Sequence, residues 1–383
     1  RDNSKTFILQ GAYSARTKLK QYNVKCSYLL EQADKLQQKY GAQYNSVIEY
    51  AYKLLLKNQA HDGICGCSTD LVHRENIMRY EKIIQIAHTI IEELRLKYGF
   101  KTPIMQSKEL IPEYKVVSKS LGVENSLLYD TQKIPVTEDF AEVYTLKYFP
   151  ATKTDLKLEV KNGKIFLSKG EKRVQVEFVR YKDEGDTYNF GAVEKDSGEV
   201  AEVYSFKNNI IKTNFFDVQV EFSQELVNFK IEWDNNLKNR LWQVKFTLKK
   251  PVTETFSEDM NTLLRRKFNP DYDMRKHLPK EKGIEVKTNF APMQRYVGCQ
   301  GFGVITQGLT EYEVREKALL VTLLRSVGVI SKPKNPSRST PAGPPIEVPE
   351  AQQLGYNHAE FSLGFFNEND YQRFVDVVFP PLC

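Results

Sequence analysis

The first hundred residues repeat their hydrophobic positions with a helical period. Segments 14–40, 44–59 and 68–98 each place apolar side chains three and four residues apart, so that one face of each helix is apolar. Gly41 and Gly99 follow the first and third segments at the positions where glycine commonly ends a helix. Three long helices joined by short loops predict a small helical bundle.

Beyond Pro103 the period changes from 3.6 residues to two. Residues 157–167 form two alternating runs around Asn162-Gly163, a strong signal for a tight hairpin. Further alternating runs follow at 173–181, 216–222, 226–233 and 241–248. We therefore predict an α+β, multi-domain chain: a three-helix bundle (1–100), a connecting segment with short strands (101–150), and a large antiparallel β-sandwich region (151–383). The proline-rich stretch 331–350 is incompatible with a central strand and predicts an ordered surface arm or a mobile loop.

Composition fits this picture. The 383 residues are 41% hydrophobic and 27% charged, which suits a soluble protein of two or three domains. No run approaches the roughly 18 apolar residues of a membrane-spanning helix, so we expect no membrane partner. The net charge of +6 comes from 55 basic and 49 acidic residues without a basic stripe, so we expect no nucleic-acid partner.

The five cysteines are an odd number without regular spacing. This pattern argues against a disulfide framework and favours a reducing, cytoplasmic compartment. Cys65 and Cys67 form a C-x-C pair, but the lack of a second cysteine pair argues against a closed structural zinc site.

The segment between the second and third predicted helices contains the most informative polar pair, His61-Asp62. Loops held by rigid helices often carry function, and imidazole suits zinc while a carboxylate can bind or orient what lies beside it. A His-Asp pair in an interhelical loop is more often a capping pair than a ligand pair, and spacing alone leaves both open. His73 and His88 lie 15 residues apart on the third helix, unlike an H-E-x-x-H zinc motif.

Several motifs, in order along the chain, resemble glycoside hydrolase family 38 α-mannosidases. "QAHDGICGC" around His61 resembles the motif that connects two helices of that family's central bundle, and "SARTKLKQYN" resembles its first helix. "KDEGDTYNFG" resembles its acidic β-turn. "FAPMQRYVGC", "GFGVITQGLTEYEV", "ALLVTLLRSVGVIS" and "AGPPIEVPEAQ" resemble its C-terminal β-domain and the arm that follows.

The resemblance implies a zinc-dependent, retaining α-mannosidase as the parent protein. It implies that His61 is one of four zinc ligands and that Asp62 contacts the sugar. The remaining ligands, the nucleophile and the acid/base carboxylate are expected on an N-terminal α/β barrel outside these residues. We therefore assign no catalytic residue here and expect the fragment alone to be inactive. Ala60 replaces a second histidine of many relatives, so subfamily and substrate stay open.

Arg325 could point toward the same pocket and bind substrate, or form a structural ion pair. Two other functions are also open. A His-Asp phosphohydrolase would need His73 and His88 to converge on His61 and Asp62. A non-catalytic carbohydrate-binding module would display exposed aromatic side chains on a sandwich face. The expected partners are an α-mannoside or oligosaccharide and the barrel of the same protein, and a homo-oligomer is possible.

Overall fold

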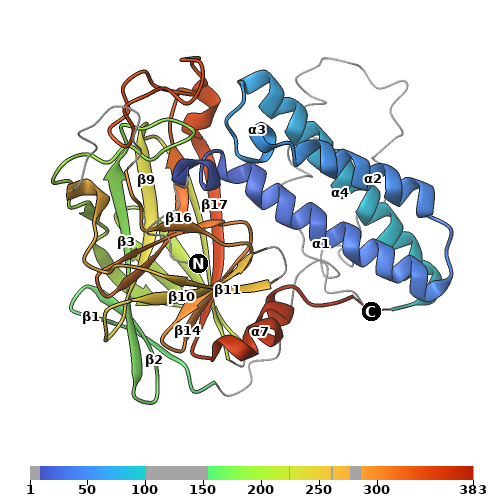
Figure 1. Ribbon diagram of the computed structural model, residues 1–383. Helices are drawn as coiled ribbons and strands as arrows, with labels where there is room; N and C mark the ends of the chain where they lie inside the picture. Colours follow the sequence, from blue (N-terminus) through green and yellow to red (C-terminus); the bar gives the residue numbers. More distant parts are fainter. Residues whose placement is uncertain (1–8, 101–153, 224, 260–261, 277–285, 383) are drawn as a thin grey trace, which may run out of the picture.

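The structure is a computed structural model that describes residues 9–100, 154–223, 225–259, 262–276 and 286–382. A group of helices lies beside a two-layer β-structure, and the C-terminal helix lies near the first helix (Figure 1). The predicted connecting segment 101–150 lies outside the described residues, and the predicted domain boundaries stay predictions.

The helical part begins with a short 3₁₀ turn, η2 (Gln10–Tyr13), and contains three long helices, α1 (Thr17–Tyr40), α2 (Asn45–Asn58) and α4 (Asp70–Tyr98). The three-helix prediction is confirmed. Gly41 and Gly99 end α1 and α4 in the left-handed conformation, with φ of +62° and +69°. Glycine reaches this region without the steric penalty of a Cβ atom, so the sequence signal had a direct conformational cause.

In the described residues the strands form two sheets, and every pairing between named strands is antiparallel. The eight-stranded sheet runs β1 (Lys157–Lys161), β2 (Lys164–Lys169), β3 (Lys172–Lys182), β9 (Arg240–Thr247), β16 (Ala318–Ser326), β15 (Glu311–Arg315) and β12 (Phe290–Pro292), with β4 (Glu199–Val200) on β3. The nine-stranded sheet runs β11 (Thr262–Lys267), β10 (Glu254–Asp259), β13 (Tyr296–Cys299), β14 (Phe302–Thr306), β17 (Gly355–Gly364), β8 (Val227–Asn235), β7 (Asp217–Phe222), β6 (Ile210–Thr213) and β5 (Val203–Lys207). The α+β fold class is confirmed.

The hairpin predicted at Asn162-Gly163 joins β1 to β2. Both residues have positive φ, +51° and +68°, as a two-residue hairpin turn of the primed type requires. Asparagine and glycine tolerate this conformation better than other residues, which is why the dipeptide was informative.

Alternation of side chains builds the core between the two sheets. Val174, Val176 and Phe178 of β3 are buried, as are Phe229 and Ile231 of β8, and all belong to one apolar cluster. Gln175 and Glu177, which lie between them on β3, and Lys230, between Phe229 and Ile231 on β8, are more exposed, as the period of two predicts.

A second apolar cluster joins the helices to the nine-stranded sheet. It combines buried residues of α1, α2 and α4 with Tyr296 of β13, Ile305 of β14, and Phe374 and Val378 of the C-terminal helix α7 (Tyr371–Val378). Among the described residues, three further 3₁₀ turns are η3 (Met274–Lys276), η4 (Pro349–Gln352) and η5 (Glu368–Asp370). No helix in the described part of the chain combines the length and apolarity needed to cross a bilayer.

Candidate functional site

His61 and Asp62 open a one-turn helix, α3 (His61–Ile64), between α2 and α4 (Figure 1). The predicted loop is therefore helical for one turn. The His61 side chain is 91% exposed and that of Asp62 53% exposed, and His61 Nε2 lies 3.5 Å from Asp62 Oδ1. The exposure places the imidazole in solvent. Because the 3.5 Å distance is at the limit of a hydrogen bond, the imidazole can bind another partner.

Close packing fixes the backbone of this turn. A Cβ atom on Gly63 would lie 3.1 Å from the carbonyl oxygen of Asn58, which is fully buried at the end of α2. The amide of Cys65 donates to the His61 carbonyl at 2.9 Å, and that of Cys67 donates to the Asp62 carbonyl at 3.1 Å. The backbone under the exposed pair is thus held while the two side chains stay accessible.

Arg16 anchors the segment that follows the turn. Its guanidinium is fully buried; Nε donates to the Gly66 carbonyl at 3.3 Å, and Nη2 donates to the Ser68 carbonyl at 3.1 Å. Nη2 also lies 2.6 Å from Asp70 Oδ1, in the first turn of α4. A single buried cation therefore ties the His61 turn to the beginning of both α1 and α4.

The acidic turn, residues 182–191, lies next to this segment. The Cys67 thiol contacts the Thr187 carbonyl at 3.6 Å. Burial raises the pKa of Tyr188 to about 12, and the negative charge of Asp62 adds to this shift. The phenol of Tyr188 is thus within electrostatic reach of Asp62. Sequence reasoning used this turn for the resemblance but gave Tyr188 no role, because the two residues lie far apart along the chain.

Arg325 lies on β16 and is fully buried. Its Nε is 2.7 Å from Asp183 Oδ2, also fully buried, and its Nη2 donates to the carbonyls of Asp186 and Asn189 at 2.6 Å. These contacts favour the structural ion pair that was one of the two alternatives. Direct contact between Arg325 and substrate stays a prediction.

The proline-rich stretch is an ordered arm that packs against the acidic turn. Arg338 pairs with Asp186 Oδ2 at 2.5 Å, with both side chains buried, and the backbone amide of Lys332 donates to the same oxygen at 2.7 Å. A Cβ atom on Gly343 would lie 3.3 Å from the Tyr188 hydroxyl. The arm therefore forms one side of the surroundings of Tyr188.

The other histidines and cysteines do not assemble a metal site in the described residues. There is no group of three or more His, Cys, Asp and Glu side chains arranged to hold a metal ion. Burial lowers the pKa of His73 to about 3 and of His88 to about 4, which fits neutral side chains packed within the bundle. Burial also raises the pKa of Cys67 to about 12, so its thiol is neutral at ordinary pH. These observations disfavour the phosphohydrolase alternative.

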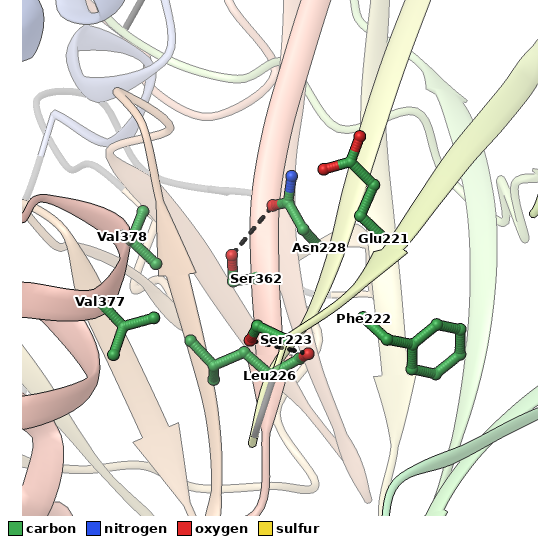
Figure 2. A pocket seen from close by; sticks show the side chains of 8 residues that line it. All are labelled: Glu221, Phe222, Ser223, Leu226, Asn228, Ser362, Val377 and Val378. Atoms are coloured by element: carbon green, nitrogen blue, oxygen red, sulfur yellow. Dashed lines mark hydrogen bonds between the residues drawn. The ribbon is translucent and has the colours of Figure 1, made fainter. Parts of the chain in front are cut away.

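The sandwich surface offers little support for a sugar-stacking platform. Tyr204 on β5 and Tyr356 on β17 are exposed, but β6, β7 and β8 separate them in the sheet order. Figure 2 shows a small hollow beside α7 and the ends of β7 and β8, where Ser362 donates to Asn228 Oδ1 at 2.9 Å. Its lining includes none of the predicted site residues.

Comparison with known proteins is consistent with this geometry. Residues 8–95, which contain His61 and Asp62, match the α-mannosidase middle domain. A protein of Halalkalibacterium halodurans named "Putative mannosylglycerate hydrolase" is 39% identical over 113 residues, 28% of this chain and 12% of the relative.

Two solved structures share the fold of nearly the whole chain. One is an α-mannosidase from Enterococcus faecalis V583, with a TM-score of 0.69 and 16% identity, matched over 98% of this chain and 57% of its own. The other is a glycosyl hydrolase family 38 protein from Enterococcus faecalis, with a TM-score of 0.69 and 17% identity, matched over 98% and 59%. The chain spans less than two thirds of each relative. The chain therefore contains a match to the α-mannosidase middle domain at residues 8–95, and nearly its whole length shares the fold of the two Enterococcus faecalis structures.

Proposed function

We propose that the chain is part of a zinc-dependent, retaining α-mannosidase, to which it contributes His61 as one zinc ligand and Asp62 as a sugar contact. The observation that carries the proposal is the exposed His61-Asp62 pair on a rigid turn within the matched middle domain. The match to the α-mannosidase middle domain supports an α-mannoside or an oligosaccharide as substrate.

The donor atoms of this pair fit a share of a zinc site. An imidazole nitrogen is a common zinc ligand, and the His61 imidazole is tied to the chain only loosely, through its 3.5 Å contact with Asp62. One donor does not complete a tetrahedral site, so the proposal requires further ligands from outside the described residues. Bound zinc would supply a Lewis acid for sugar hydroxyls.

The residues of this chain would position the sugar and border its binding site, and would not take part in bond cleavage. Asp62 can accept hydrogen bonds from sugar hydroxyls, and Tyr188 can border the same space. A retaining glycosidase needs a nucleophilic and an acid/base carboxylate, which we assign to the barrel of the same protein. The fragment alone should therefore not hydrolyse α-mannosides.

The sandwich would serve as the structural platform beneath the site. The four free cysteines among the described residues favour a reducing, cytoplasmic location.

The first test is the zinc content of the whole protein that contains this chain, measured by elemental analysis. His61→Ala should lower zinc affinity by more than the about 10- to 100-fold that loss of an outer-shell partner costs. Its thermal stability should change little, because the side chain is exposed. His358→Ala, in the sandwich strand β17, is the control and should keep its zinc. Unchanged zinc content in His61→Ala would refute the proposal.

Asp62 provides a separate test of the sugar contact. Asp62→Asn should lower kcat/KM for an aryl α-mannoside about 10- to 100-fold, the range for loss of one charge-assisted hydrogen bond. Zinc content should stay close to that of the wild type. Equal kcat/KM values in the variant and the wild type would exclude Asp62 from the sugar site.

A further inference from the structure

The segment Gln10 to Lys20, here called the seam segment, joins the helical bundle to the β-sandwich. The amide of Gly11 donates to the Tyr188 carbonyl at 2.9 Å, and Thr310 Oγ1 donates to the Tyr13 carbonyl at 2.7 Å. Ala15 forms an isolated parallel bridge with Arg325 of β16. The same segment carries Arg16, which anchors the His61 turn. A displacement of this segment on the sandwich would therefore move Arg16 and, with it, the turn that carries His61.

A buried carboxyl group lies beneath the seam segment. Glu311 is the first residue of β15 and is 1% exposed. Thr322 Oγ1 donates to its Oε1 at 2.7 Å, whereas its Oε2 is buried without a hydrogen-bond partner among the described residues. A carboxylate can accept about four hydrogen bonds, so an ionised Glu311 would be poorly compensated in this place.

The nearby cations are engaged elsewhere. Lys20 donates its ammonium group to the Ala15 carbonyl, and Arg325 pairs with Asp183. Arg325 and Lys20 still attract the Glu311 charge through space, and the hydroxyl of Ser14 also favours the charged form.

One charged group opposes the ionised form: Glu313, two residues along β15, repels it. Tyr13, on the seam segment, is a neutral phenol at ordinary pH and adds no charge. Burial is the largest influence and outweighs the favourable ones, so the pKa of Glu311 is raised to about 7.

We propose that Glu311 is a proton-controlled latch between the bundle and the sandwich: neutral, it lets the seam segment pack closely, and ionised, it loosens this contact. The proposal does not depend on the mannosidase function.

The direction of the effect follows from linkage. A carboxyl group whose pKa is higher in the folded than in the unfolded state adds stability that is fully present below the unfolded pKa of about 4.3. This stability is lost as the pH rises through the folded pKa of about 7. The seam segment is therefore packed closely on the sandwich in mildly acidic solution and less closely in alkaline solution.

The test compares melting temperatures of wild type and Glu311→Gln at pH 5.5 and pH 8.5. When the pH rises from 5.5 to 8.5, the melting temperature of the wild type should fall by about 3 to 6 °C more than that of the variant. This difference reflects the loss of one buried proton. Titrating groups that do not interact with Glu311 are common to both proteins and cancel in this difference. Equal pH dependence in the two proteins would overturn the proposal.

Glu313→Gln is the matched control on the same strand. Glu313 pairs with the buried Arg275 at 2.8 Å, so its loss should lower the melting temperature by a similar amount at both pH values. If Glu313→Gln abolished the pH dependence as Glu311→Gln does, the effect would not belong to Glu311 and the proposal would fail.

A second measurement locates the effect. Hydrogen exchange of peptides covering residues 10–20 and 61–68, corrected for the intrinsic rate, should be faster at pH 8.5 than at pH 5.5 in the wild type and unchanged in Glu311→Gln. Infrared difference spectra between these pH values should also show a protonated carboxyl band that the variant lacks. Exchange in residues 10–20 that does not respond to pH would contradict the latch even if stability changed.

Discussion

Arg338 and Asp186 show how single side chains hold the surroundings of the candidate site. Burial alone would raise the pKa of Asp186, but the hydrogen bonds and charge of Arg338 outweigh it, and the pKa lies below its ordinary value. The stabilisation from this pair is thus present above the unfolded pKa of about 3.9 and is lost as the pH falls through the lower folded value. The pair joins the proline-rich arm to the acidic turn.

Arg338→Ala should lower the free energy of unfolding by about 3 to 5 kcal/mol, because Asp186 would remain as a buried, unpaired charge. Urea denaturation at neutral pH measures this change. Arg74→Ala is the control: Arg74 pairs with Glu350 but is 63% exposed, so its loss should cost no more than about 1 kcal/mol. Similar losses of unfolding free energy in both variants would contradict the larger contribution that we assign to the buried Arg338–Asp186 pair.

Among the elements, the turn between α2 and α4 depends on close backbone approach. Gly66 has φ of +75°, and a Cβ atom there would lie 2.8 Å from the carbonyl oxygen of Ala15. The turn that presents His61 therefore packs directly on the seam segment, without room for a side chain between them.

Gly66→Ala should destabilise the protein more than Gly41→Ala. Both glycines have positive φ, which costs alanine about 1 to 2 kcal/mol, but a Cβ atom on Gly41 would meet no described atom within 4 Å. The clash at Gly66 should add about 1 to 3 kcal/mol. Urea denaturation of the two variants tests this order, and an equal loss would mean that the Ala15 backbone moves away without cost.

Across the whole molecule, α7 connects the bundle to the sandwich. Phe374 stacks on Phe366 with ring centroids 3.9 Å apart and belongs to the apolar cluster that includes α1 and α4. Because this cluster crosses from helices to strands, we expect both parts to unfold together.

Phe374→Ala should lower the free energy of unfolding by about 3 to 5 kcal/mol, the range for removing a buried aromatic ring. Circular dichroism of helix and tryptophan fluorescence of the sandwich should shift to the same midpoint. Val377→Ala, at a partly buried position of α7, should have a smaller effect. Separate midpoints for helix and sandwich in the wild type would show that α7 does not couple them.

Local sequence patterns were enough to predict the three long helices, the hairpin and the antiparallel β-structure. The period of 3.6 and the terminal glycines predicted the three helices, and the period of two with Asn162-Gly163 predicted the hairpin and the antiparallel strands. These signals are local, because helix and turn conformations depend on residues a few positions apart. The His61-Asp62 pair was also visible, since both residues lie in one short segment.

Which distant residues meet could be learned only from the folded chain. The contacts of Cys67 with the acidic turn and of Arg325 with Asp183 join positions more than a hundred residues apart, and no local pattern specifies them. The ionisation of Glu311 likewise depends on burial beneath the seam segment, since its neighbours along β15 give no sign of it. Local propensity thus set the elements, while packing between them set the surroundings of each charge.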